Sequence, residues 1–140
     1  MNEELEKRFK VLEDIEAIKK FHINYFYLLC EQRWDDMAEC FAEDATMELL
    51  DSGVVKGKRE ISAVFHNVLA ERVKRNDGHF VGQPIITVSG DRAKGQWILY
   101  LFFAEPEVRW LQGRQECEYI RVEGEWKFSK VKFTAPWPGE

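Results

Sequence analysis

The sequence predicts an α+β domain in which helices come first and a curved, mixed or antiparallel sheet follows. Apolar residues recur every three or four positions in the first half, and after Gly78 they follow the extended pattern of strands joined by short turns. In the last strand the apolar residues switch from even positions (Phe128) to odd ones (Val131), which predicts a bulge near Ser129. A bent sheet closed by three helices on its concave face forms a cone with an interior.

Three helical segments precede the sheet. The first is long and amphipathic, and its apolar stripe comprises Leu5, Phe9, Leu12, Ile15, Ile18, Phe21, His22, Tyr25 and Leu29. The second is short and runs from Trp34 to Asp44, with Asp35 as its N-cap. The third begins near Lys58 and turns one apolar face inward, formed by Ile61, Val64, Phe65, Val68 and Leu69.

Extended segments separated by turn signals make up the sheet. They are predicted at Thr46–Leu50, Val54–Lys56, His79–Val88, Ala93–Phe103, Trp110–Val122 and Glu125–Thr134, with turns at 51–53, 89–91 and 123–124. Gly82 and Pro84 interrupt one of these strands. The segment Ala93–Phe103 is almost continuously apolar, so we expect both of its faces to be covered.

Length and composition fit one domain, residues 1–140. The apolar fraction of 45% excludes a disordered chain, and a net charge of −5 without a basic face argues against a nucleic-acid partner. No apolar run approaches the roughly 18 residues that span a bilayer, and the N-terminus lacks the pattern of a signal peptide. We therefore expect a cytoplasmic protein without a membrane partner.

The cysteines and histidines give no sign of a metal site. Cys30, Cys40 and Cys117 are odd in number and lack the C-x-x-C spacing of a zinc site, so we expect reduced thiols. His22, His66 and His79 have no acid beside them at helical or strand spacing, and His66 is expected at the surface.

Short strings spread over nearly the whole chain resemble the SnoaL-like domain of the nuclear transport factor 2-like superfamily, within the branch of scytalone dehydratase, bile-acid dehydratase and lindane dehydrochlorinase. In chain order they are Asp14-Ile15-Glu16-Ala17-Ile18, Tyr25, Trp34-Asp35, Phe41-Ala42-Glu43-Asp44-Ala45, Gly57, Gly78-His79-Phe80-Val81-Gly82, Gly90-Asp91-Arg92-Ala93 and Gly124-Glu125-Trp126-Lys127-Phe128. The resemblance implies a cystatin-like cone with an apolar pocket, acid/base chemistry without metal or cofactor, and homo-oligomers, dimers or trimers.

The same resemblance suggests catalytic residues. His79 matches the histidine that removes a proton, and Tyr25 matches a tyrosine one helical turn before an aspartate that charges that histidine. Cys30 stands in the place of this aspartate, and Leu101 falls near a second acid. A neutral thiol is a weak hydrogen-bonding group and cannot replace a carboxylate as the partner of an imidazole.

Further side chains are candidates for contact with a ligand. His22 lies one turn before Tyr25 and can face the interior as a polar contact, or it can be a core histidine. The aromatic side chains, among them Phe26 and Trp97, either fill the core or line a pocket for a flat, apolar, ring-containing ligand. Cys117 alternates with the acidic Glu116 and Glu118 and so faces the other side of its strand.

Two functions remain open at this point. One is a small-molecule lyase or isomerase, similar to a dehydratase, that acts on a hydrophobic ring-containing substrate. Its base would be His79, and Tyr25 would donate a hydrogen bond to the developing oxyanion or leaving hydroxyl. The alternative is a binding protein that keeps the cone and its pocket but has no catalytic activity, which the two missing acids favour.

Overall fold

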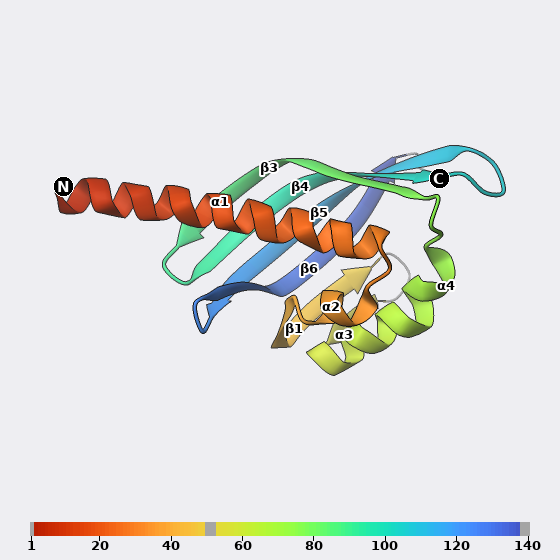
Figure 1. Ribbon diagram of the computed structural model, residues 1–140, viewed down its shortest axis with the longest axis horizontal. Coiled ribbons are helices and arrows are strands. Elements are labelled where there is room, and N and C mark those ends of the chain that lie inside the picture. Colours follow the sequence, from red (N-terminus) through yellow and green to blue (C-terminus); the bar gives the residue numbers. More distant parts are fainter. Residues whose placement is uncertain (1, 50–52, 138–140) are drawn as a thin grey trace.

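A computed structural model describes residues 2–49 and 53–137 (Figure 1). Its helices are α1 (Glu3–Cys30), α2 (Trp34–Ala38), α3 (Lys58–Val64), the π-helical turn η1 (Phe65–Leu69) and α4 (Ala70–Arg72). The segments α3, η1 and α4 follow one another and together form the predicted third helix. None of the described helices combines the length and apolar character required to cross a lipid bilayer.

The strands form one mixed sheet in the order β2-β1-β6-β5-β4-β3. They are β1 (Phe41–Leu49), β2 (Gly53–Lys56), β3 (Gly78–Ser89), β4 (Arg92–Phe103), β5 (Arg109–Val122) and β6 (Glu125–Trp137). Only β1 and β6 pair in parallel among the described pairs, and the other neighbours are antiparallel. The predicted α+β class with a curved sheet is therefore confirmed, and the sheet is open rather than closed.

The segment around Phe41 differs from the prediction. Phe41–Asp44 is strand rather than helix, because the backbone amide of Phe128 donates to the Cys40 carbonyl (2.8 Å) and draws the chain into the sheet. The predicted cap is also wrong: α2 begins at Trp34, its N-cap position is Arg33, and Asp35 lies in the first helical turn. Leu50 and the turn residues Asp51 and Ser52 lie outside the described residues.

The predicted strand irregularities are confirmed. The register between β5 and β6 shifts so that Tyr119 pairs with Phe128 and Glu118 with Lys130, which leaves Ser129 as the extra residue of a bulge. The register between β3 and β4 shifts between Gly82 and Ile85. Bulges of this kind bend the strand that carries them and increase its twist.

Helix α1 runs across the concave side of the sheet, as Figure 1 shows, and packs mainly against β3. Its second half buries one face among the rings of the core: Ile18, His22, Tyr25, Phe26 and Leu29. The N-terminal part extends past the edge of the sheet, and its apolar side chains Leu5, Phe9 and Leu12 are exposed.

Strand β4 is covered on only one face within this chain. Ala93, Gly95, Trp97 and Leu99 are buried, and the alternate positions are exposed or half-buried. The expectation that both faces are covered is therefore not met by the single chain, because the helices lie on one side of the sheet. Phe102 on the opposite face is 49% exposed.

Candidate functional site

A mostly apolar cavity of about 240 Å³ lies between α1, the segment η1–α4 and the concave face of the sheet. Its lining includes four predicted site residues from three elements: Tyr25 and Phe26 on α1, His79 on β3 and Leu101 on β4. The walls are completed mainly by aliphatic and aromatic side chains, namely Leu29, Met37, Leu49, Leu69, Val73, Leu99, Phe103, Leu111 and Phe133. An apolar cavity with few polar groups is the usual form of a small-molecule site.

His79 is a half-buried imidazole in the cavity wall. Its Nδ1 atom is buried and has no hydrogen-bond partner in the part of the chain that the structure describes. Burial lowers the pKa of His79 below its usual value, and the charge of Asp77 opposes this effect. The imidazole is therefore neutral at neutral pH, which is the protonation state of a general base.

Tyr25 is almost fully buried among aromatic rings, with Phe128 and Phe41 at centroid distances of 5.0 and 5.9 Å. Burial raises the pKa of its hydroxyl above the usual value, so the group keeps its proton. The hydroxyl makes no hydrogen bond with the described part of the chain. It is therefore a donor available to a ligand in the cavity that Tyr25 lines.

His22 is held inside the core by hydrogen bonds at both ring nitrogens. Its Nε2 lies 2.9 Å from Gln115 Oε1 and its Nδ1 lies 2.9 Å from the Tyr119 hydroxyl. The ring stacks on Trp97 with centroids 4.1 Å apart, and Trp97 Nε1 donates to the Tyr119 hydroxyl (2.9 Å). Burial lowers the pKa of His22 to about 3, so it is a neutral core group. Neither His22 nor Trp97 lines the cavity.

The two cysteines among the predicted ligand contacts lie outside the cavity lining. Cys30 is exposed at the end of α1 and lines an outer groove together with Tyr27, Phe80 and His79. Cys117 is buried in the core, and burial raises the pKa of its thiol above the usual value. His79 contributes to both the outer groove and the cavity, so it forms part of the wall between them.

Three polar residues of the cavity were not identified from the sequence. Gln115 comes from β5, Asp77 precedes β3, and Arg72 ends α4. The Asp77 carboxylate accepts a hydrogen bond from the backbone amide of Lys74 (2.9 Å), which fixes it near His79. Asp77 stands two residues before His79, so the expectation that no acid lies beside the histidines at strand spacing is wrong for His79. Gln115 gave no sequence signal, because a polar residue within a strand is ordinarily expected at the surface.

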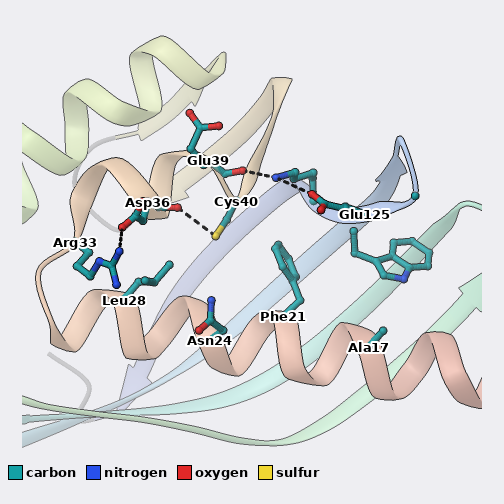
Figure 2. A pocket seen from close by; sticks show the side chains of 12 residues that line it. Ala17, Phe21, Asn24, Leu28, Arg33, Asp36, Glu39, Cys40 and Glu125 are labelled. Carbon is teal, nitrogen blue, oxygen red and sulfur yellow. Dashed lines mark hydrogen bonds and ion pairs between the residues drawn. The ribbon is translucent and has the colours of Figure 1, made fainter.

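A larger open groove of about 610 Å³ lies between α1, α2 and the turn from β5 to β6 (Figure 2). Its charged groups are engaged with neighbours of the same chain. Arg33 pairs with Asp36, and Lys127 Nζ donates to the Glu39 carbonyl (2.8 Å). The groove contains no histidine, and Cys40 Sγ is directed at the Asp36 carbonyl (3.5 Å). This surface is held together by its own contacts, and the apolar cavity that contains His79 is the better candidate for chemistry.

No group of three or more histidine, cysteine, aspartate or glutamate side chains that could hold a metal ion occurs within residues 2–49 and 53–137. The polar groups of the cavity are instead a neutral imidazole, a phenol, an amide and two charged side chains. This set can take up a proton, donate hydrogen bonds and surround an apolar ring.

Comparison with known proteins places this arrangement in context. One solved structure, an NTF2-like protein with a cystatin-like fold from Novosphingobium aromaticivorans, is 20% identical with a TM-score of 0.81, over 96% of this chain and 90% of that one. A scytalone dehydratase-like protein of the same organism is 20% identical (TM-score 0.78; 89% and 85% covered). A hexachlorocyclohexane dehydrochlorinase of Novosphingobium barchaimii is 21% identical (TM-score 0.78; 90% and 88% covered).

These likenesses establish a shared fold. Among curated proteins, none matches this sequence. The SnoaL-like domain family matches residues 10–132, which include α1 from Lys10 onward and most of β6. The chain therefore belongs to the SnoaL-like domain family.

Proposed function

We propose that the protein is a lyase or isomerase that acts on a hydrophobic, ring-containing small molecule, with His79 as general base. The observation that carries the proposal is the position of His79: a neutral imidazole in the wall of a mostly apolar cavity. Tyr25 lines the same cavity with a protonated hydroxyl and donates a hydrogen bond to the reacting oxygen or leaving group.

The proposed step is an elimination or an isomerisation that begins with loss of a proton. A C–H bond next to a carbonyl or a leaving group breaks, and the proton moves to a nitrogen of His79. The electron pair either expels the leaving group as a new double bond forms, or delocalises onto the carbonyl oxygen before a carbon is reprotonated. His79 then returns its proton to the leaving group or to the substrate, and the histidine is regenerated.

Family membership supports this class of reaction. Among the similar solved structures, one protein is described as scytalone dehydratase-like and another as a hexachlorocyclohexane dehydrochlorinase. Both names denote eliminations. The cavity of this chain has an apolar lining and a histidine suited to the same type of step.

A second candidate function is binding without turnover. It is favoured by one observation: no carboxylate accepts a hydrogen bond from His79 within the described residues, and Cys30 stands where the resemblance implies the partner acid. Asp77 acts on His79 only through its charge. A base without a hydrogen-bonded acid stabilises its imidazolium less and reacts more slowly.

A thermal-shift screen with hydrophobic ring compounds, followed by an assay for released water or acid on each hit, distinguishes the two functions. We expect the His79→Ala variant to retain binding and to lose turnover by about 100-fold or more. His66→Ala is the matched control, because His66 is exposed and pairs with Asp35 away from the cavity. Unchanged turnover in His79→Ala would reject the base, and binding without turnover in the native protein would favour the second function.

A further inference from the structure

A directed chain of hydrogen bonds crosses the core and ends at the cavity. Gln115 Oε1 lies 2.9 Å from His22 Nε2, and a carbonyl oxygen only accepts, so Nε2 carries the proton of His22. His22 Nδ1 is then an acceptor and receives the hydroxyl proton of Tyr119 (2.9 Å). The Tyr119 oxygen in turn accepts from Trp97 Nε1 (2.9 Å). Each donor therefore faces an acceptor, and the chain runs from Trp97 to Gln115.

The last member of this chain presents an unused donor. Gln115 is almost fully buried, with an exposed fraction of 6%, and it lines the cavity. Its side-chain oxygen accepts the hydrogen bond from His22. Its amide nitrogen makes no hydrogen bond with the described residues. In this part of the chain, the side-chain nitrogens that are fully buried and lack a partner are His79 Nδ1 and Trp126 Nε1. Gln115 Nε2 also lacks a partner but is not fully buried. Because Gln115 lines the cavity, its Nε2 is a donor that a ligand in the cavity can reach.

The amide cannot turn over without loss of a buried hydrogen bond. If its nitrogen faced His22, the proton of His22 would have to sit on Nδ1, and the Tyr119 hydroxyl, whose oxygen already accepts from Trp97, would lose His22 as the acceptor of its own proton. The stack of His22 on Trp97 and the bond from Tyr119 hold the imidazole in place. Gln115 therefore offers a donor of fixed orientation, and such pre-organised donors discriminate among ligands.

We propose that Gln115 is a specificity-determining residue whose amide N–H selects ring ligands that carry a carbonyl oxygen over hydrocarbons of the same shape. A ring ketone satisfies this donor, whereas a hydrocarbon displaces water from it and leaves it unpaired. The inference rests on the proposed function, because it takes the cavity as the substrate site, and it defines the substrate class as ring ketones.

The first test uses the native protein with β-tetralone and tetralin, two bicyclic probes that differ by one carbonyl oxygen. Titration of β-tetralone should shift the side-chain amide proton signals of Gln115 downfield in ¹H–¹⁵N spectra, and tetralin should not. The Nε2-protonated tautomer of His22 should be visible in long-range ¹⁵N spectra of its ring. A His22 proton on Nδ1, or equal effects of both probes on Gln115, would overturn the inference.

The second test compares affinities in two variants. Gln115→Met keeps the length of the side chain and removes the donor, so β-tetralone should bind about tenfold more weakly while tetralin binding is unchanged. Leu111→Met alters the same cavity without touching a polar group and should leave the affinity ratio of the two probes unchanged. An equal loss for both probes in Gln115→Met, or no loss for either, would contradict the role of Gln115.

The outcomes separate this inference from the proposed function. Preference for the ketone that depends on Gln115, without turnover of any ligand, supports the inference and rejects the lyase or isomerase. Turnover that depends on His79 but is indifferent to Gln115→Met rejects the inference and supports the enzyme. Failure of the native protein to bind either probe at millimolar concentration counts against both.

Discussion

At the scale of single residues, the two histidines of the interior differ in what satisfies their nitrogens. His22 has a partner at each nitrogen and a ring stacked against its face, so it serves as a structural link between α1 and the sheet. His79 has a buried Nδ1 without a partner among the described residues, and it lines the cavity. The sequence alone could suggest that both face the interior but could not tell these roles apart, since both partners of His22 lie on β5, more than 90 positions away.

His22 should make the protein less stable in acid. Its pKa is about 3 in the fold and near 6.5 in an unfolded chain, so below about pH 6.5 the unfolded state binds a proton that the folded state does not. The free energy of unfolding should therefore fall by about 2 kcal/mol between about pH 6.5 and pH 5. Denaturant unfolding at a series of pH values measures this dependence.

The matched variant is His22→Phe, which keeps an aromatic ring beside Trp97 and removes the titrating group. It should be less stable at every pH, because Gln115 and Tyr119 lose their partner, but its stability should change less over the same pH range. A pH dependence as steep as that of the native protein would show that His22 is not its source.

At the scale of elements, long strands and helices were predictable and the short segment between α2 and β1 was not. The apolar residues of α1 recur at helical spacing, and apolar and polar residues alternate along β5, because each element buries one face. Both patterns are visible in the local sequence. Phe41–Asp44 has no such local signal. Its conformation is set by parallel pairing with β6, in which Phe41 lies beside Phe128, 87 positions later in the chain. Pairing of this kind overrides local helix propensity.

A second contact between distant elements joins α1 to the β-hairpins. The Asp14 carboxylate accepts two hydrogen bonds from Arg121 (3.0 Å each), and Arg121 also bonds Asp91 in the turn between β3 and β4. These bonds hold the pKa of Asp14 below its usual value. The stability that they supply is therefore present above about pH 4 and is lost as Asp14 is protonated at lower pH.

Asp14→Ala should lower the free energy of unfolding by about 2–3 kcal/mol, because it leaves a largely buried guanidinium without its bidentate partner. Asp91→Ala provides the control: this carboxylate is exposed, so its loss should cost less than about 1 kcal/mol. Chemical denaturation of both variants near neutral pH gives the comparison. Equal costs for the two substitutions would contradict the assigned difference in burial.

At the scale of the whole molecule, the cone and its family were predictable, and the composition of the cavity only in part. Tyr25, Phe26, His79 and Leu101 line one cavity, and their roles there stay a prediction. Gln115 and Asp77 were missed, because their place in the lining depends on sheet curvature and on the end of α4. Curvature arises from bulges between distant strands, so a single sequence reports where a bulge lies but not which side chains it brings together.

The uncovered face of the sheet leads us to predict a homo-oligomer. Tyr100, Phe102 and Trp110 lie together on that face, with Tyr100 and Phe102 stacked at 6.1 Å, and Phe102 and Trp110 are about half exposed. Apolar side chains exposed together on a sheet are commonly buried by a second subunit. Light scattering should therefore report a dimer or a trimer for the native protein.

Phe102→Glu should shift this assembly toward the monomer, because the substitution places a charge where the second subunit would pack. Val54→Glu adds the same charge at an exposed apolar position on β2, at the opposite edge of the sheet, and should leave the assembly intact. A monomeric native protein at working concentration would contradict the prediction.

The central claim is that His79 removes a proton from a ring ligand held in the cavity. The most direct test measures by NMR how fast β-tetralone in heavy water takes up deuterium at the carbon beside its carbonyl. The rate is compared between the native protein and His79→Ala. The account predicts that the native protein accelerates exchange above the buffer rate, and that His79→Ala binds the ketone but returns exchange to the buffer rate. Exchange at the buffer rate with native protein that binds the ketone, or acceleration that survives His79→Ala, would contradict it.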